Sequence, residues 1–159
     1  MNRYKDAKIE DCDIKLKDAI KLAVEENKGI FVYGNTGVGK THFCYAIANS
    51  KHLKVENFVL LLSEFRDYMM KGYYNEKVKE LCEADYLIID DIGSEKVTDF
   101  VVEFIYTIVN RRYENQKRTV LTTNLQFKEF GDRYGDRILS RIAEMCIMVE
   151  LKGNAKRLS

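Results

Sequence analysis

The sequence predicts a single α/β domain with a parallel five-stranded sheet and helices on both of its faces. Short apolar runs alternate along the chain with longer segments whose apolar residues recur at helical spacing, an order typical of a parallel sheet. The runs are apolar almost throughout, as strands buried on both faces are. The 159 residues, 46% of them hydrophobic, suffice for one compact domain with its own core.

Five of these runs are expected to be strands, because each is short and apolar along nearly its whole length. They are Ile30–Tyr33, Phe58–Leu62, Tyr86–Asp90, Val120–Thr123 and Cys146–Leu151. Parallel sheets of this kind bind ligands at the carboxyl ends of their strands. Polar residues that follow the runs are therefore the first candidates for a functional site.

Six other segments are expected to form helices. In the longest of them, Val101, Ile105 and Ile108 mark an apolar face at intervals of four and three residues. The helices are expected at Ile14–Glu26, Thr41–Ser50, Ser63–Met70, Asn75–Glu83, Thr98–Glu114 and Asp136–Glu144. We interpret residues 1–28 as a short N-terminal segment with one helix and residues 29–159 as the main domain.

Composition narrows the class of protein. The 26 basic and 25 acidic residues leave a formal charge of +1, which does not mark a dedicated nucleic-acid binder but allows a local basic patch. Met1–Glu10 lacks the apolar stretch of a signal peptide, and the apolar runs are too short to span a bilayer. We expect a soluble intracellular protein with no membrane partner.

The four cysteines are Cys12, Cys44, Cys82 and Cys146. They lack the spacing of a zinc site and are expected to be reduced and mostly buried.

The strongest motif follows the first predicted strand. It fits the phosphate-loop pattern G-x-x-x-x-G-K-[ST], and its residues are Gly34, Asn35, Thr36, Gly37, Val38, Gly39, Lys40 and Thr41. The glycines let backbone N–H groups face a phosphate, and the N-terminus of the next helix adds its positive dipole end. We expect Lys40 to reach the β- and γ-phosphates and Thr41 to offer its hydroxyl to Mg²⁺. Together with the adjacent His42, the loop predicts a site for ATP and Mg²⁺.

Two carboxylates, Asp90 and Asp91, end the third predicted strand. A carboxylate at the end of a buried strand is costly unless it meets a cation or hydrogen-bond donors. Beside a phosphate loop, the expected cation is Mg²⁺, so Asp90 is assigned to its coordination shell, through water, and Asp91 to orienting or activating the attacking water. Taken alone, the same residues could form a simple turn.

Two further groups stay ambiguous from the residues alone. Thr122-Thr123-Asn124 ends the fourth predicted strand, where Asn124 could touch the γ-phosphate or the attacking water, although an ordinary Thr/Asn turn is the commoner case. Arg133, Arg137 and Arg141 recur at every fourth residue. Such arginines are usually solvated or paired with carboxylates, and can also neutralise charge during phosphoryl transfer. Arg157 near the C-terminus has the same ambiguity.

The combined motifs resemble the AAA+ ATPase domain of the DnaC/DnaI-like helicase loaders of bacteria and phages, whose relatives include the IstB-like transposition helper ATPases. The resemblance runs from about Arg3 to Arg157, and it is carried by Gly34–Phe43, Asp85–Glu95, Arg112–Leu125, Asp136–Met145 and Gly153–Arg157. It implies an AAA+ P-loop fold without a separate lid domain. It also implies ATP hydrolysis that is weak in the isolated chain, a nucleotide-dependent homo-oligomer, and the cytoplasm of a bacterium or a phage-infected cell.

The same resemblance implies roles for single residues. Asn124 would be the sensor-1 residue. Arg141 would be the arginine finger that reaches the ATP of a neighbouring subunit, with Arg137 beside it on the helix. Arg157 would be the sensor-2 arginine, which contacts the γ-phosphate within its own subunit. A replicative helicase or another replication protein would be the partner. Loaders grip it with a separate N-terminal domain, in whose place Met1–Glu26 could be a short adaptor.

Residues 65–79 mix basic and aromatic side chains. Aromatic rings that stack on bases and cations that meet phosphates are typical of single-stranded DNA binding, and in the resembled family this region faces the DNA. The competing interpretation is an amphipathic helix pair with aromatic residues packed inward and lysines solvated.

The residues leave several functions open. The first hypothesis is an ATP-driven replication factor that acts on single-stranded DNA and resembles a helicase loader. The alternatives are a transposition helper ATPase that targets duplex DNA, a small P-loop kinase, and a nucleotide-gated binding module with little turnover. The two strand-end carboxylates, the Thr-Thr-Asn tip and the paired arginines fit hydrolysis better than a kinase, which needs an arginine-rich lid and an acceptor pocket.

Overall fold

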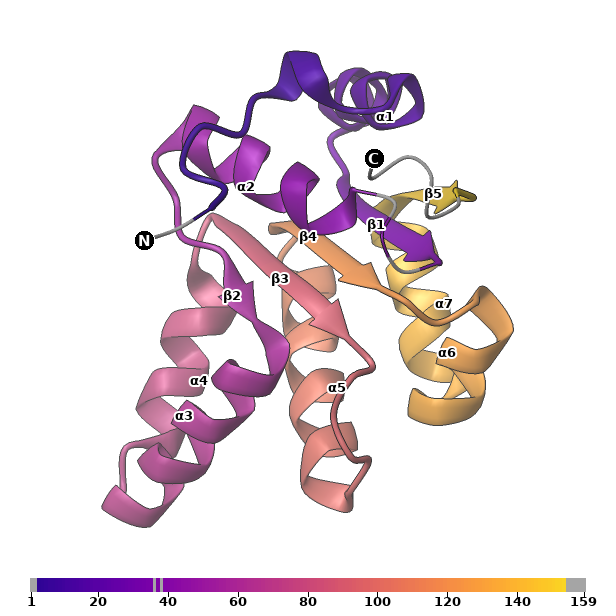
Figure 1. Cartoon of the computed structure of the whole chain (residues 1–159). Coiled ribbons are helices and arrows are strands. Elements are labelled where there is room, and N and C mark those ends of the chain that lie inside the picture. Colours follow the sequence, from indigo (N-terminus) through magenta and orange to yellow (C-terminus); the bar gives the residue numbers. More distant parts are fainter. Residues whose placement is uncertain (1–2, 36, 38, 154–159) are drawn as a thin grey trace.

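The computed structural model describes residues 3–35, 37 and 39–153, and it confirms the predicted α/β fold. Five strands form one all-parallel sheet in the order β2-β3-β4-β1-β5 (Figure 1). The strands are β1 (Gly29–Gly34), β2 (Glu56–Asn57), β3 (Tyr86–Ile92), β4 (Arg118–Thr123) and β5 (Cys146–Leu151). Strand β1, which leads into the phosphate loop, therefore lies between β4 and β5.

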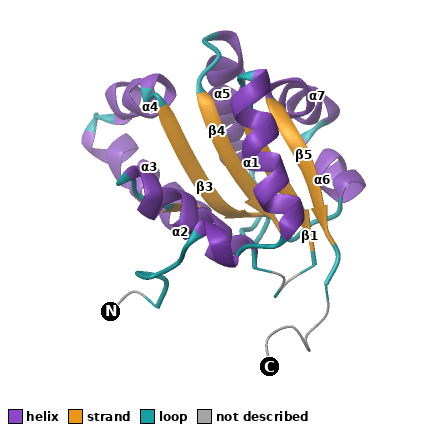
Figure 2. Ribbon diagram, turned by 90° about the horizontal axis from the view of Figure 1, so that it is seen from above, coloured by secondary structure: helices purple, strands orange, loops and turns teal. Residues whose placement is uncertain are grey.

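Helices cover both faces of the sheet (Figures 1 and 2). One face carries a short 3₁₀ turn, η1, and two helices: η1 (Ile9–Asp11), α1 (Ile14–Glu26) and α2 (Lys40–Lys51). The other face carries α3 (Phe58–Lys71), α4 (Tyr74–Glu83), α5 (Asp99–Glu114), α6 (Phe127–Tyr134) and α7 (Asp136–Met145). None of the helices within the described ranges is both long and apolar enough to cross a membrane.

The alternation of side chains along β1 creates two separate cores. Ile30 and Val32 are buried in the core beneath α1 and α2, whereas Phe31 is buried in the larger core beneath α3 to α7, because successive strand residues point to opposite faces. All four cysteines are free and buried, as expected. The near-continuous apolar character of the central strands is thus explained by burial on both sides.

The predicted strand Phe58–Leu62 is wrong, because these residues form the first turns of α3. Asn57 caps this helix: its side-chain oxygen accepts a hydrogen bond from the backbone N–H of Leu60 at 3.2 Å. The apolar run also has a helical face, since Phe58, Leu61 and Leu62 are buried while Leu60 is 64% exposed. Only Glu56–Asn57 pairs with the sheet.

Helix α6 was not among the predicted elements. It begins at a capping box, in which the Glu129 carboxylate accepts from the backbone N–H of Gln126 at 3.1 Å and the Gln126 side chain accepts in return from the backbone of Glu129. Phe130 and Tyr134 lie one turn apart and are buried. A helix of eight residues with two apolar anchors is too short for its periodicity to be evident in the sequence.

Arg112, at the end of α5, is fully buried and has no carboxylate partner among the bonds of the described residues. Its guanidinium donates to the carbonyl oxygens of Leu81 and Ala84, each at 2.8 Å, to the Arg118 carbonyl at 2.8 Å and to Thr119 Oγ1 at 2.9 Å. Burial lowers the pKa of Arg112 to about 10, which still leaves it charged at neutral pH. A single side chain thus ties the end of α4 to the start of β4.

Candidate nucleotide-binding site

The phosphate loop lies between β1 and α2, at the carboxyl edge of the sheet. Gly34 ends β1 at φ 133°, and a Cβ there would lie 2.1 Å from the carbonyl oxygen of Leu151 on β5. Only glycine permits this close approach of the two backbones. Gly39 caps α2 in the left-handed region, so the helix begins at Lys40 with its N-terminus toward the loop. Thr36 and Val38 of the motif lie outside the described residues.

Lys40 is held inside its own loop. Its Nζ donates to the carbonyl oxygens of Gly34 at 3.0 Å and Asn35 at 2.5 Å, and the residue is only 6% exposed. Burial lowers the pKa of Lys40 to about 8, an effect that the charges of Asp90 and Asp91 oppose. A partly desolvated ammonium at the mouth of the loop can exchange these carbonyl oxygens for the oxygens of a phosphate.

The structure brings Thr41 and Asp90 together, as the sequence predicts for a magnesium site. The Asp90 carboxylate is 4% exposed and accepts hydrogen bonds from Thr41 Oγ1 at 2.8 Å and from Thr122 Oγ1 at 2.5 Å. Cys44 Sγ lies 3.6 Å from the same carboxylate. A hydroxyl and a carboxylate are oxygen ligands of the kind that Mg²⁺ prefers, so this pair fits the cation directly or through water.

Asp91 lies next to Asn124, which the sequence also predicts to act near the γ-phosphate. Asp91 Oδ1 accepts from Asn124 Nδ2 at 3.3 Å and from Ser94 Oγ at 2.8 Å. The backbone of Asp91 has a positive φ of 63°, and its N–H donates to Thr122 Oγ1 at 2.9 Å. The two consecutive carboxylates thus have different surroundings: Asp90 is buried against hydroxyls, whereas Asp91 is half-buried and bordered by an amide and a hydroxyl.

These groups share one cavity of about 440 Å³. It is lined by Arg3, Tyr4, Gly37, Gly39, Lys40, Thr41, His42, Asp90, Asp91, Thr122 and Asn124. Arg3 and Tyr4 are additions that sequence reasoning missed, because their neighbours in space are some forty residues away in the chain. Asn49 Nδ2 holds this segment by donating to the carbonyl oxygens of Tyr4 at 3.2 Å and Ala7 at 3.0 Å. The Tyr4 ring stacks on Tyr45 at 5.0 Å.

The candidate arginines do not line this cavity. Arg141 Nε donates to Asn110 Oδ1 at 3.1 Å, and its guanidinium lies 4.8 Å from the centre of the Tyr113 ring, so it is directed toward α5 of its own chain. Arg137 is exposed on α7 and borders a shallow hollow with Asp99 and Glu103. Arg157 lies outside the described residues.

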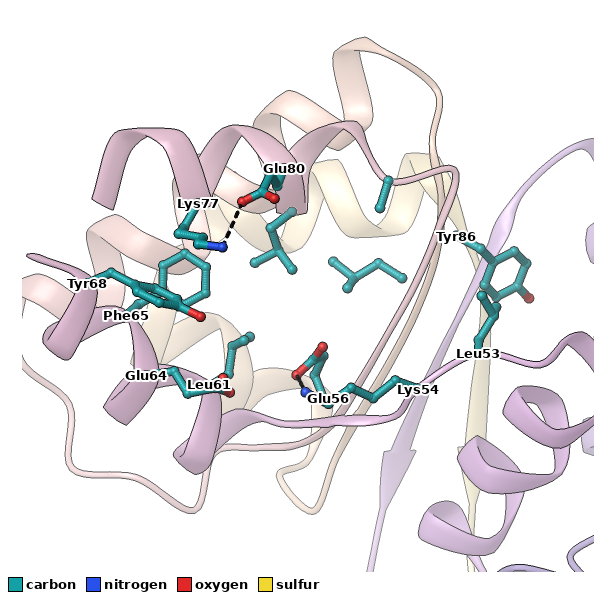
Figure 3. Close-up of a pocket in the computed structure, with 13 residues that line it drawn as sticks. Leu53, Lys54, Glu56, Leu61, Glu64, Phe65, Tyr68, Lys77, Glu80 and Tyr86 are labelled. Carbon is teal, nitrogen blue, oxygen red and sulfur yellow. Dashed lines mark ion pairs between the residues drawn. The ribbon is translucent and has the colours of Figure 1, made fainter. Parts of the chain in front are cut away.

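The candidate DNA-binding segment, residues 65–79, spans the end of α3 and the start of α4. Phe65 and Tyr68 line a separate cavity of about 360 Å³ between these helices and the sheet edge (Figure 3). Tyr74 packs edge-on against Phe65 at 6.1 Å. Three of the four aromatic residues in this segment, Phe65, Tyr68 and Tyr74, are therefore packed inward, as the competing interpretation expects. Tyr73, 52% exposed, is the aromatic residue left at the surface, beside exposed Lys71.

Comparison with known proteins identifies the family. The family described as "IstB-like ATP binding protein" matches residues 8–159, so the chain belongs to it. The protein of insertion sequence IS5376 from Geobacillus stearothermophilus, named as an ATP-binding protein, is 26% identical over 91% of this chain and 61% of its own length. The chain thus spans less than two thirds of that relative.

Solved structures share the fold. The crystal structure of the DnaC helicase loader is similar with a TM-score of 0.79 and 27% identity, covering 96% of this chain and 100% of that one. The replication initiator DnaA bound to AMPPCP and single-stranded DNA has a TM-score of 0.72 and 25% identity, covering 86% of this chain and 45% of that one. The fold is therefore the P-loop AAA+ fold, in an ATP-binding family related to helicase loaders and to the ATP-binding proteins of insertion sequences.

We predict that affinity for nucleotide falls as the pH rises above about 8. Lys40 pairs with phosphate only in its ammonium form, and a bound phosphate would raise the lowered pKa of Lys40. Binding therefore takes up a proton above the pKa of the free protein, and Kd should rise by up to about tenfold per pH unit there while staying constant below it. Titration with a fluorescent, non-hydrolysable ATP analogue between neutral and alkaline pH measures this Kd.

Lys40→Arg is the control for this prediction. Its guanidinium stays charged, so the alkaline rise in Kd should vanish. A Kd that does not change with pH in the unaltered protein would contradict the role assigned to Lys40.

Proposed function

We propose that this IstB-like protein binds Mg²⁺ and ATP in the cavity of the phosphate loop and hydrolyses the nucleotide. The observation that carries the proposal is the convergence of Lys40, the Thr41–Asp90 pair and the Asp91–Asn124 pair on one cavity. A cation for phosphate, oxygen ligands for a metal and a carboxylate for water are the parts that phosphoryl transfer to water requires. A kinase would need an acceptor pocket beside them.

Each residue has a definite part in the proposed reaction. The loop residues from Gly34 to His42 bind the phosphates through their backbone N–H groups and the Lys40 ammonium. Thr41 and Asp90 would hold Mg²⁺, which neutralises phosphate charge. Asp91 accepts a hydrogen bond from the attacking water and orients it, since its side chain lies at the cavity and is only half-buried. Asn124 fixes the Asp91 carboxylate and borders the position of the γ-phosphate.

We propose further that the complete site needs a second subunit. Arg141 and Arg137 lie on α7, apart from the cavity of their own chain, and an arginine supplied in trans would complete the charge neutralisation. Arg157 would act within its own subunit. Residues 29–159 would carry this ATPase, while residues 1–28 would form an N-terminal segment that reaches the cavity through Arg3 and Tyr4.

The proposed biological role is that of a replication factor that acts on single-stranded DNA and resembles a helicase loader, with a replicative helicase or another replication protein as partner. Its support is the likeness to the DnaC loader over that chain's whole length and to a DnaA structure that holds single-stranded DNA. The second candidate is a transposition helper ATPase that acts on duplex DNA, favoured by the IstB-like family match and the insertion-sequence relative.

Replacing Asp91 by Asn should leave ATP binding intact and lower kcat by roughly a hundredfold or more, because an amide cannot take the role of a general base. Radiolabelled ATP hydrolysis and equilibrium binding measure the two effects. Asp85→Asn, at an exposed carboxylate just before β3, is the matched control and should match the unaltered protein. Unchanged turnover in Asp91→Asn removes that residue from the mechanism, and ATP that binds but is never cleaved by the unaltered protein would favour a nucleotide-gated module.

A mixture of two inactive variants should recover activity if the arginine acts in trans. Arg141→Ala keeps a working phosphate loop, and Asp91→Asn keeps a working arginine, so a mixed interface should restore up to about a quarter to a half of the specific activity. Activity is followed at increasing protein concentration, with association checked by sedimentation. A mixture that associates yet stays inactive would contradict an arginine supplied by the neighbour.

Tyr73→Ala should weaken binding to oligo-dT by roughly tenfold, because a stacked base contributes about 1–3 kcal/mol. Fluorescence anisotropy with single-stranded and duplex probes of equal length measures it. Leu22→Ala, an exposed apolar residue on α1 across the sheet, is the control. Equal binding by both variants would exclude Tyr73, and a preference of the unaltered protein for duplex would favour the transposition role.

A further inference from the structure

Glu95 is a buried carboxylate in an otherwise exposed loop. It is 9% exposed, whereas Ser94 before it and Lys96 after it are exposed. A buried carboxylate requires donors or a charged partner. Glu95 has two donors, the backbone N–H of Gly93 at 2.9 Å and the Tyr134 hydroxyl, and an ion pair with Arg133, whose Nε lies at 3.9 Å. Arg133 also donates to the Glu95 carbonyl oxygen. The loop after β3 is thereby fastened to the last turn of α6.

The other end of this loop carries Asp91. Ser94, the neighbour of Glu95, donates its hydroxyl to Asp91 Oδ1 at 2.8 Å. Gly93 lies between them at φ 114°, and a Cβ there would lie 2.9 Å from the Leu125 side chain and 3.1 Å from Thr123 Oγ1. The loop is therefore closely packed over the end of β4, and a movement of Glu95 would be transmitted to Asp91 rather than absorbed within the loop.

Helix α6 connects the same loop to the arginine-bearing helix. At its start, Gln126 Nε2 donates to Asn35 Oδ1 of the phosphate loop at 3.2 Å. At its end, Arg133 and Tyr134 hold Glu95, and Gly135 alone separates α6 from α7. Leu139 of α7 packs directly over Gly131 of α6, where a Cβ would lie 3.0 Å away. Both ends of α6 thus contact loops that border the nucleotide cavity.

We propose that Glu95 is a positioning residue: it holds the loop that bears Asp91 against the end of α6, and so couples the nucleotide cavity to the helix that carries Arg137 and Arg141. The proposal rests on the proposed ATPase function and adds a route by which one subunit's nucleotide state would reach the arginines it presents to its neighbour. Glu95 acts through Asp91 and α6 and does not line the cavity itself.

The side chains of Tyr134 and Arg133 are suited to a lasting contact with the Glu95 carboxylate. Burial raises the pKa of Tyr134, and its hydrogen bond to Glu95 raises it further, so the phenol remains a donor throughout the neutral and alkaline range. Arg133 supplies the positive charge that pairs with the Glu95 carboxylate. The side chain of Glu95 is thereby held in one position that a glutamine of the same shape can reproduce only in part, since glutamine lacks the charge that Arg133 attracts.

The test compares Glu95→Ala, Glu95→Gln and Tyr134→Phe with the unaltered chain. Asp132→Asn is the control, since it breaks only the exposed Lys128–Asp132 pair on α6. Three readouts are needed: Kd for AMPPCP with Mg²⁺, kcat for ATP, and hydrogen–deuterium exchange of residues 136–145 with and without AMPPCP. We expect Kd within about twofold and kcat lowered about 10- to 100-fold in Glu95→Ala, with partial recovery in Glu95→Gln. We also expect AMPPCP to slow exchange of α7 in the unaltered chain and in Asp132→Asn, but not in Glu95→Ala or Tyr134→Phe.

The outcomes separate this proposal from the proposed function. If AMPPCP slows exchange of α7 equally in all four variants, or if Glu95→Ala keeps full turnover, the coupling role is overturned while ATP hydrolysis stands. If Glu95→Ala fails to fold, Tyr134→Phe and Glu95→Gln decide: exchange that rises throughout the chain while AMPPCP still slows α7 to the same degree assigns Glu95 to stability alone and overturns the proposal. Absence of nucleotide binding in the unaltered chain overturns the proposed function and this proposal with it.

Discussion

The structure depends most on the buried carboxylate of Asp90. It lies at the end of β3 and accepts hydrogen bonds from Thr41 on α2 and from Thr122 on β4. Because the strands are parallel, their carboxyl ends meet at one edge of the sheet, and Asp90 joins the phosphate-loop helix to two of those ends. An uncompensated carboxylate at 4% exposure would be costly. The two hydroxyls and the nearby Lys40 charge offset that cost, and they hold the ends of β3 and β4 beside the start of α2.

The backbone changes direction immediately after Asp90, and the remaining site geometry follows from that change. The positive φ of Asp91 ends the regular pairing of β3 with β4, which shows a register shift between Ile89 and Ile92. The carboxylate of Asp91 is consequently free of the sheet and meets Asn124 and Ser94. Two adjacent residues of the same type thus acquire different environments from the backbone alone, one suited to a metal ion and the other to water.

Much of this arrangement could be predicted from sequence, because phosphate loops and strand-end carboxylates have a fixed local spacing. Lys40, Thr41, Asp90, Asp91 and Asn124 converge as expected. The misassigned Phe58–Leu62 shows the limit: an apolar run fits a strand or a helix equally well until its cap, here Asn57, and its exposed residue, Leu60, are known. Arg3 and Tyr4 could not be predicted because their contacts are long-range, and a position of Arg137 or Arg141 relative to a second subunit would be a property of an assembly, which one chain does not specify.

The buried guanidinium of Arg112 has a consequence for how the chain folds during synthesis. The carbonyl oxygens it binds belong to residues made about thirty positions earlier, at Leu81 and Ala84, and its remaining partners, Arg118 and Thr119, follow it. The end of α4 is therefore synthesised before the guanidinium that binds its carbonyl oxygens in the native structure, and this contact waits for α5 and β4. Residues 81–119 are expected to become native together, as one cooperative folding unit.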